Sequence, residues 1–249
     1  MSSPKIYLIT GANRGLGRGL VEALAQRPNV TIVAGVRDLE NASSKSLGTL
    51  SVGSGSKIIN VKIDSKDPST VKSAISSLSS EHSISHLDIV IANAGISKYY
   101  GVAAETPISE VNEHFEVNTV ATLILFQETW PLLQKAEKPM FVAISTGIGS
   151  IADMGSMPLP ATAYGISKAA LNYMVRKIHF ENPGLNAWVM SPGWVRTDQG
   201  NAGAVAVGMD AAPVTLEQSI TGMLDKIDNA TLEETSGTFQ SFDETKYAW

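Results

Sequence analysis

Tyr164 and Lys168 are the residues of this sequence whose types and spacing point most directly to chemistry. They lie in the stretch TAYGISKAALN, residues 162–172, which predicts the start of a helix, and residues four apart on a helix are neighbours on one face. A phenol beside an ammonium exchanges protons more easily than a free phenol, because the cation favours the phenolate. The pair predicts acid/base chemistry, although such pairs also occur on ordinary solvated helix surfaces.

The composition narrows the possible partners. A chain of 249 residues with 43% hydrophobic residues can bury a sizeable core. Its formal net charge of −5 offers no basic surface for a nucleic acid or an anionic membrane, so we expect a small-molecule partner. The absence of cysteine excludes disulfides and thiolate catalysis, and the four histidines have no metal-ligand spacing, so no metal site is predicted. With no signal-like start and no apolar run of about 18 residues, a cytoplasmic protein is expected.

A strand, a glycine turn and a helix follow one another near the start of the sequence. Residues 5–10 are an apolar run that ends at Gly11, and Gly15 and Gly17 open a helical pattern. The spacing is GxxxGxG rather than GxGxxG, but the same physics applies, because a glycine backbone can approach a pyrophosphate that meets the helix N-terminus. The predicted cofactor-binding residues of this turn are Gly11, Asn13, Arg14, Gly15, Leu16 and Gly17.

The end of the second predicted strand, residues 30–36, indicates which dinucleotide is bound. An acidic residue there suits the ribose of NAD, whereas an arginine suits the 2′-phosphate of NADP. Arg37 stands at this tip and Arg14 is a possible second cation, so NADP(H) is predicted; the alternative is that both arginines are only solvated. Asp64, at the end of a strand over 57–64, either accepts from the adenine amino group or caps the following helix.

The later strands add further polar and small residues. Residues 86–96 predict a strand that runs into Asn93, Ala94 and Gly95, where small residues allow close approach of a flat ligand. A long helix over about 109–136, bent at Pro131, contains Asn118 among apolar residues, as a water anchor or an interhelix hydrogen-bonding group.

The strand over 139–145 ends in Ser145 and Thr146, and parallel sheets bind ligands at this end of their strands. Residues 185–191 predict another strand, and residues 198–213 predict a mobile substrate lid. A helix around 216–227 and a strand around 237–242 follow. The alternation predicts an α/β fold: one Rossmann-fold domain over 1–249, with a doubly wound parallel sheet and helices on both faces.

Taken together, TGANRGLG, the NAG at 93–95, YGISK and PGWVRT resemble the short-chain dehydrogenase/reductase family. The resemblance implies a seven-stranded sheet, NADPH as hydride donor, and Tyr164 as the proton donor to a carbonyl oxygen. It also implies that Lys168 lowers the tyrosine pKa and bonds the nicotinamide ribose, and that Asn118 fixes a proton-relay water. The further cofactor-binding residues that it implies, besides Tyr164 and Lys168, are Asn93, Ala94, Gly95, Pro192, Gly193, Val195 and Thr197.

The catalytic hydroxyl departs from the family pattern. Thr146 stands where the family has its serine, with Ser145 just before it. Because Tyr164 follows Thr146 by an unusually long gap, Ser150 stays open as a third candidate. We expect Thr146 first and Ser145 second.

The sequence is also similar to norsolorinic acid ketoreductase-like and sniffer-like carbonyl reductases, and this resemblance implies a bulky or aromatic ketone substrate in polyketide or other secondary metabolism. Apolar and aromatic residues expected near the pocket are Tyr99, Tyr100, Met154, Met157 and Trp194. The alternatives are a non-catalytic NADP(H)-binding regulator, or an alcohol dehydrogenase, imine reductase or dehydratase on the same fold. The resemblance suggests a homodimer or homotetramer, although polar residues predicted on the outer face of the Tyr164 helix, Asn172 among them, would also permit a monomer.

Overall fold

The computed structural model describes residues 4–249. The chain divides into two compact units. Unit 1 holds the residues up to 94 together with 123–142, and unit 2 holds 95–122 together with 143–249. None of the helices within 4–249 has the length and apolar character needed to cross a membrane.

Seven strands form one sheet in the order β3-β2-β1-β4-β5-β6-β7. The pairs β1 with β2, β1 with β4, β2 with β3 and β6 with β7 are parallel. The strand order reverses between β1 and β4, as in a doubly wound sheet, and this agrees with the predicted fold class. The strands are β1 Lys5–Thr10, β2 Val30–Val36, β3 Lys57–Lys62, β4 Ile89–Ala92, β5 Met140–Ile144, β6 Asn186–Ser191 and β7 Phe239–Ser241.

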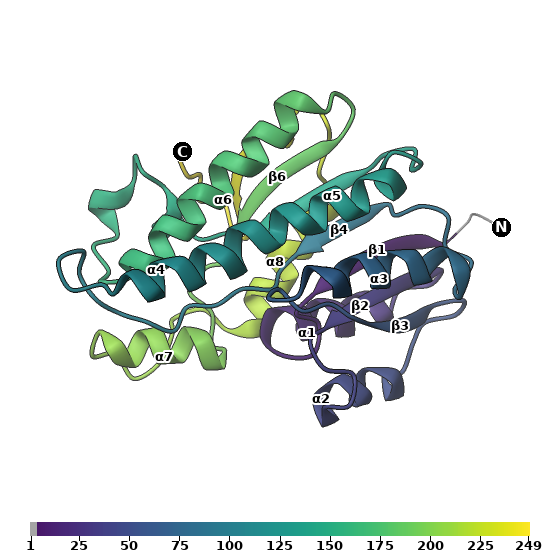
Figure 1. Cartoon of the computed structure of the whole chain (residues 1–249), viewed down its shortest axis with the longest axis horizontal. Helices are drawn as coiled ribbons and strands as arrows, with labels where there is room; N and C mark the ends of the chain where they lie inside the picture. Colours follow the sequence, from purple (N-terminus) through teal and green to yellow (C-terminus); the bar gives the residue numbers. More distant parts are fainter. Residues whose placement is uncertain (1–3) are drawn as a thin grey trace. The chain divides into compact units, whose positions relative to one another are not determined.

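Helices alternate with these strands along the chain (Figure 1). The helices are α1 Gly15–Ala25, α2 Ala42–Lys45, α3 Pro68–Ser80, α4 Ile108–Phe115, α5 Ala121–Leu133, α6 Thr162–Glu181, α7 Asp198–Ala206 and α8 Leu216–Asp228.

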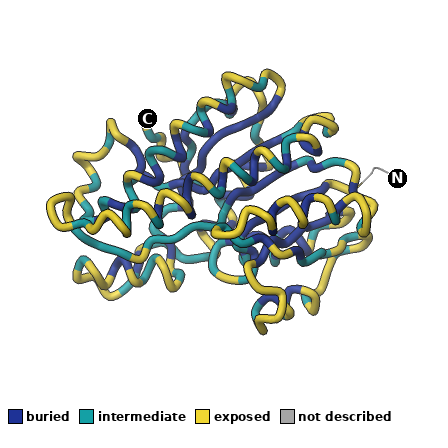
Figure 2. The backbone as a smooth tube through the Cα atoms, viewed as in Figure 1, coloured by how far each residue is buried: buried dark blue, intermediate teal, exposed yellow. Residues whose placement is uncertain are grey.

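The core of unit 1 lies around β1 and β2. Every residue of β2 is buried, as expected for a strand covered on both faces. Helix α1 places Leu20, Val21 and Leu24 on its buried side at helical spacing, and all three are fully buried. Figure 2 shows the strands β1, β2 and β4 of this unit as mostly buried, whereas the edge strand β3 is largely intermediate, and the exposed backbone lies on the outer turns of the helices and in the loops.

In unit 2, helix α6 lies along β6 (Figure 1). All six residues of β6 are buried, and Trp188 at its centre is fully buried. Strand β7 pairs with β6 through Val189, Met190 and Ser191, while α6 packs against α4 on another side. Helix α6, which carries Tyr164 and Lys168, is therefore held by neighbours from two directions.

Several predicted elements differ in extent. Strand β4 ends at Ala92 instead of 96, because the following backbone leaves the ladder, and β3 ends at Lys62 instead of 64. The helix predicted over 109–136 is interrupted by a π-helix, Glu116–Val120, whose wider turn contains Asn118. Pro131 is accommodated within α5, which continues to Leu133. Much of the predicted lid is helix α7.

Candidate functional site

The glycine turn of unit 1 is a tightly closed piece of backbone. Gly11 and Gly15 have φ values of +64° and +52°, which residues with a side chain rarely adopt. Gly17 has no room for a side chain, because a Cβ there would lie 2.2 Å from the carbonyl oxygen of Gly11 and 2.7 Å from Nδ2 of Asn93. The positive φ angles and the lack of space for a Cβ each explain why these positions are glycine, without any bound ligand.

Helix α1 starts directly at this turn with its first N–H groups uncapped. Its N-cap residue, Arg14, makes no side-chain capping bond, and the first turn contains no acidic residue. Leu16 lies in that first turn. Free amide donors and the positive end of the helix dipole make such a terminus suitable for an anion such as a pyrophosphate.

Asn93 and Thr10 link the ends of β4 and β1. The Nδ2 of Asn93 donates to the carbonyl oxygen of Thr10 over 2.8 Å, and the Thr10 hydroxyl accepts from the backbone N–H groups of Asn93 and Ala94, each over 3.0 Å. The Asn93 side chain thus supports the glycine turn, a role that its expected position beside a ligand did not include.

Arg14 and Arg37 are exposed, and their guanidinium groups have no hydrogen bond or ion pair to other residues of the described chain. Asn13 donates instead to the hydroxyls of Ser43 and Ser44, over 2.9 and 3.2 Å. Two unpaired cations next to a glycine cradle fit an anionic nucleotide.

Asp64 has a local backbone role. Its Oδ1 accepts from the N–H of Lys66 over 3.0 Å, and its own N–H donates to the hydroxyl of Thr70. The capping residue of α3 is Asp67, whose side chain accepts from the N–H of Ser69. Of the two interpretations of Asp64, helix capping is wrong, and contact with an adenine stays a prediction.

Unit 2 carries Tyr164 and Lys168 in the first two turns of α6. Lys168 is 4% exposed, and its Nζ donates to the carbonyl oxygen of Ile144, the last residue of β5, over 2.7 Å. The same Nζ lies 5.8 Å from the centroid of the Tyr164 ring. Burial lowers the pKa of Lys168 to about 8, because a buried ammonium loses hydration.

The pKa of Tyr164 is shifted opposite to the expected direction. Burial of the phenol raises it above the ordinary value of 10.0, and the neighbouring Tyr100 raises it further. The physical reason is that desolvation outweighs the cation, whose Nζ is turned toward the carbonyl of Ile144. Tyr164 is therefore protonated at neutral pH, which is the form of a proton donor.

Asn118 is fully buried, and its carboxamide is occupied by protein groups. Oδ1 accepts from the N–H of Ile96 over 2.8 Å, while Nδ2 donates to the carbonyl oxygen of Ile96 and to the Ser167 hydroxyl, each over 2.9 Å. Both amide protons are thus used, and the side chain ties the segment after Gly95 to α6. π-Helical turns such as the one around Asn118 are frequent at functional sites.

The three candidate hydroxyls have different surroundings. Ser145 is buried and donates to Oδ1 of Asn172 over 2.5 Å, and Ser150 is buried and bonded to Asp153. Thr146 is only partly buried, and within residues 4–249 its hydroxyl makes a single hydrogen bond, a long one of 3.4 Å accepted from the N–H of Ile148. Thr146 therefore has the hydroxyl that is most available to a ligand.

The loop after Thr146 packs on α6. A Cβ at Gly149 would lie 3.0 Å from Cβ of Lys168 and 3.1 Å from Nδ2 of Asn172, and Asn172 donates to the carbonyl oxygen of Gly149. Ile148 lies against Gly165, next to Tyr164. These contacts pack the loop that follows Thr146 against the face of α6 that carries Lys168 and Asn172.

The predicted cofactor segment after β6 shapes the start of α7. Gly193 has a φ of +79° and no room for a Cβ beside Phe242. The carbonyl of Pro192 accepts from Ser219, Val195 bridges to Val214, and the Thr197 hydroxyl caps α7 by accepting from the N–H of Gly200. That these residues contact a cofactor stays a prediction.

Sequence reasoning missed the role of Asn172, which was expected on the outer face of α6 but is buried against Ser145 and Gly149. Its spacing was a usable signal, because Tyr164, Lys168 and Asn172 are four residues apart and share one helix face. No comparable pattern in the sequence indicates the electrostatic effect of Tyr100 on Tyr164.

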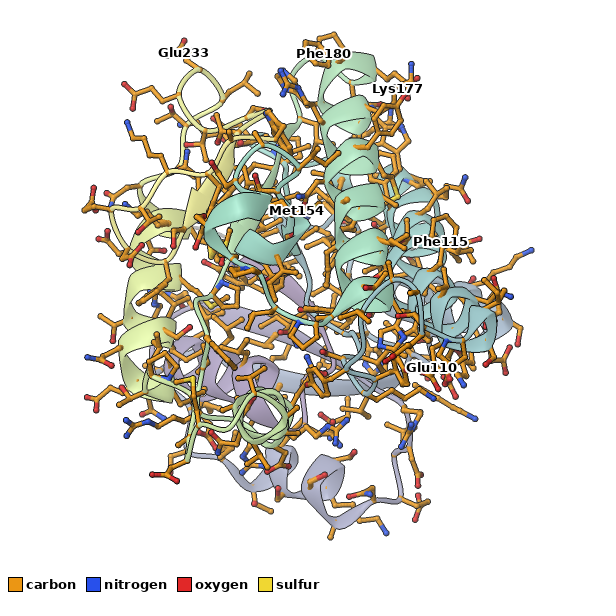
Figure 3. All side chains as sticks on the ribbon, turned by 90° about the vertical axis from the view of Figure 1, so that its left-hand side faces the viewer. Glu110, Phe115, Met154, Lys177, Phe180 and Glu233 are labelled. Carbon is orange, nitrogen blue, oxygen red and sulfur yellow. The ribbon has the colours of Figure 1, made fainter. Side chains whose placement is uncertain are left out.

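Of the aromatic and sulfur-containing residues expected around the pocket, some pack against α7 or the loop after Thr146, and the others do not. Tyr100 lies beside α7, because its hydroxyl is 3.1 Å from where a Cβ at Gly203 would stand, and Trp194 donates to the carbonyl of Gly200 in the same helix. Met157 packs on Gly147. Met154 is 57% exposed and lies on the outside of the unit (Figure 3), and Tyr99 folds onto its own turn.

The chain matches the family model described as short chain dehydrogenase over residues 5–204. It is 43% identical over 236 residues to norsolorinic acid ketoreductase of Aspergillus parasiticus, covering 94% of this chain and 87% of that protein. Among solved structures, it is similar to an NADPH-bound carbonyl reductase from chicken fatty liver, with a TM-score of 0.85 and 28% identity, and to the carbonyl reductase Sniffer of D. melanogaster, with 0.84 and 26%; each match covers 100% of both chains. These matches confirm the resemblance seen in the sequence motifs, and the chain belongs to the short chain dehydrogenase family.

Proposed function

We propose that this protein is an NADPH-dependent ketoreductase that reduces a bulky or aromatic ketone in polyketide or other secondary metabolism. The observation that carries the proposal is the arrangement on α6, where a protonated Tyr164 lies beside a buried Lys168 and the loop of Thr146. The names of the relatives point the same way: they are ketoreductases and carbonyl reductases.

NADP(H) is the proposed cofactor because of the charge at the nucleotide turn. The glycine cradle and the uncapped start of α1 would hold the pyrophosphate, and the exposed guanidinium groups of Arg14 and Arg37 would pair with the 2′-phosphate. NAD lacks that phosphate and would leave both cations without a partner. When bound, the nicotinamide supplies the hydride.

The chain's own groups supply the proton and the electrostatic stabilisation. Hydride addition to a ketone builds negative charge on its oxygen, and a hydroxyl already directed at that oxygen stabilises the charge as it develops. Thr146 is the proposed group for this role, and Tyr164 donates the proton as general acid. Because Asn118 has used its amide protons, its proposed role is to hold the backbone after Gly95 beside Lys168.

The substrate is proposed to lie within unit 2, on the surface formed by Tyr164 and Thr146. Tyr100, Met157 and Trp194 offer the flat and apolar contacts that an aromatic ketone would use. Helix α7 and the residues after it, the segment predicted as a lid, would cover the substrate while it reacts. One catalytic domain is proposed for the whole chain.

The proposed assembly is a homodimer or homotetramer formed through α6. This helix exposes large apolar side chains, and Figure 3 shows Phe180 at its far end. Tyr173 and Phe180 are 73% and 68% exposed. Burial of such residues against a second copy would gain hydrophobic free energy.

The test is NADPH consumption with a panel of aromatic and polyketide-like ketones, headed by norsolorinic acid, the compound in the name of the relatives. The Tyr164→Phe variant should bind NADPH with unchanged affinity and lose turnover by roughly 10²–10⁴-fold, since it lacks the general acid. Tyr173→Phe, an exposed tyrosine on the same helix, is the matched control and should keep full activity.

Equal turnover in Tyr164→Phe and wild type would refute the assignment of the proton donor. Tight NADPH binding without turnover of any ketone would favour a non-catalytic, cofactor-binding regulator. Turnover only in the direction of alcohol oxidation would contradict the proposed role as a reductase.

A further inference from the structure

We propose that residues 247–249, here called the aromatic strap, position the Thr146 hydroxyl, and that Tyr247 is the residue that does so through Gly147. This inference rests on the proposed function, since it concerns the same hydroxyl. Tyr247 would be a positioning residue and not a catalytic one.

Gly147 follows Thr146 directly and is enclosed by two side chains. A Cβ at Gly147 would lie 2.7 Å from Cε1 of Tyr247 and 2.7 Å from Sδ of Met157. The Tyr247 ring therefore rests against the backbone that carries Thr146. A glycine allows the ring to come this close, and movement of the ring would leave the peptide after Thr146 without support on that side.

Hydrogen bonds join the strap to the rest of the same loop. The backbone oxygen of Trp249 accepts from the N–H of Ala152 over 3.1 Å, and the N–H of Ala248 donates to Oδ2 of Asp153 over 2.8 Å. That oxygen also accepts from the Ser150 hydroxyl over 3.2 Å. These bonds tie the strap to the part of the loop that follows Ser150, and Asp153 shares its Oδ2 between the strap and the Ser150 hydroxyl.

The strap itself is seated on regular structure. The Phe239 ring in β7 lies 4.9 Å from the Tyr247 ring and 5.8 Å from the Trp249 ring, centroid to centroid. The Arg176 guanidinium of α6 lies 4.8 Å from the Trp249 ring centroid, within the range of a cation–π interaction. Strand β7 and helix α6 are held in place by their own packing. The strap residues that contact them are therefore held in place too.

The loop over 146–153 is thus held on two sides. On one side, Gly149 packs on Lys168 and Asn172 of α6; on the other, the strap contacts Gly147 and Ala152. Among the described residues, the long bond from Ile148 is the one hydrogen bond that orients the side chain of Thr146. The orientation of the hydroxyl therefore depends on where the loop backbone lies, which is what the strap determines.

The test compares Tyr247→Ala with Tyr247→Phe. Since a misplacement of about 1 Å costs roughly 10²-fold in rate, Tyr247→Ala should lower kcat by roughly 10–100-fold with nearly unchanged KM and NADPH affinity. Tyr247→Phe keeps the ring and should restore wild-type kcat, because the hydroxyl makes no hydrogen bond to the described residues. Trp249→Ala should produce a smaller loss of kcat in the same direction.

Hydrogen exchange of the backbone over 146–153 is the second readout, and it does not depend on turnover. Exchange there should rise in Tyr247→Ala and be normal in Tyr247→Phe, while the rest of α6 stays protected. Phe115→Ala, which removes an exposed ring on α4, is the control for ring loss and should leave kcat and exchange over 146–153 unchanged.

Wild-type kcat and wild-type exchange in Tyr247→Ala would overturn the proposal. A rise in KM alone would also overturn it, since Tyr247 would then contact substrate directly. If the wild-type protein reduces no ketone, the proposed function fails, and the exchange experiment still decides whether the strap holds the loop.

Discussion

Lys168 should make the stability of this protein rise with pH in a defined window. Its pKa falls from 10.5 to about 8 on folding because the ammonium is buried. Between these two values the unfolded chain binds a proton that the folded chain does not, so the free energy of unfolding increases with pH. Below pH 8 both states are protonated, and the folded state carries the full cost of the buried charge, about 3 kcal/mol.

The perturbation is Lys168→Met, which keeps the length of the side chain and removes the charge. The variant has no group that titrates at this site. Its free energy of unfolding minus that of wild type should therefore decrease by about 1 kcal/mol between pH 7 and pH 9. For a chain of this size the difference between the two melting temperatures should then change by roughly 2–4 °C.

The assay is urea unfolding, followed by circular dichroism, at pH 7, 8 and 9. Lys177→Met is the control, because Lys177 lies on the same helix, its side chain is 56% exposed and Glu181 raises its pKa, so it stays charged across this range. Figure 3 shows Lys177 near the end of α6. If the difference in free energy of unfolding between wild type and Lys168→Met does not change with pH, the reasoning is refuted. Lys168→Met should also reduce turnover at every pH.

Three further predictions address the rest of the site. Arg37→Asp should move cofactor preference from NADPH toward NADH, measured as the ratio of the two kcat/KM values; an unchanged ratio would remove Arg37 from the ribose site. Thr146→Val should lose turnover by roughly 10²-fold, as expected for loss of a donor to developing charge, whereas Thr146→Ser keeps the hydroxyl and should be active. If Ser145→Ala loses more turnover than Thr146→Val, Ser145 and not Thr146 is the catalytic hydroxyl. Gly17→Ala should weaken NADPH binding, measured by fluorescence titration, since the added carbon would clash with the Gly11 carbonyl; wild-type affinity would show that the turn is adaptable.

The fold could be predicted because its signals are local. The apolar run of β2 and the helical spacing of α1 each appear within a dozen residues, and Gly11, Gly15 and Gly17 mark the turn between strand and helix. The ends of strands and helices are harder to predict where contacts between residues far apart in the sequence determine them. Strand β4 stops at Ala92 because the chain beyond turns toward Asn118, a contact across 22 residues that no local pattern contains.

The residue types of the site could be predicted, but not their electrostatics or their partners. Spacing alone placed Tyr164 beside Lys168, yet the direction of the tyrosine pKa depends on how much water the fold removes from the phenol. Likewise, the sequence ranks Thr146 ahead of Ser145 and Ser150 only by resemblance to the family pattern. They differ only after Asn172 and Asp153 have taken two of the three hydroxyls as partners.

The interlocked glycine turn also bears on how fast a cofactor is exchanged. Because Gly17, Gly11 and Asn93 are already in contact, the turn needs no rearrangement that would slow association and loses little conformational entropy on binding. The residence time of a bound dinucleotide would then be set by the proposed ionic contacts of Arg14 and Arg37, which are exposed to solvent and therefore screened by salt. If release of the oxidised cofactor limits turnover, the enzyme should work faster as ionic strength rises, until weaker binding of NADPH becomes limiting.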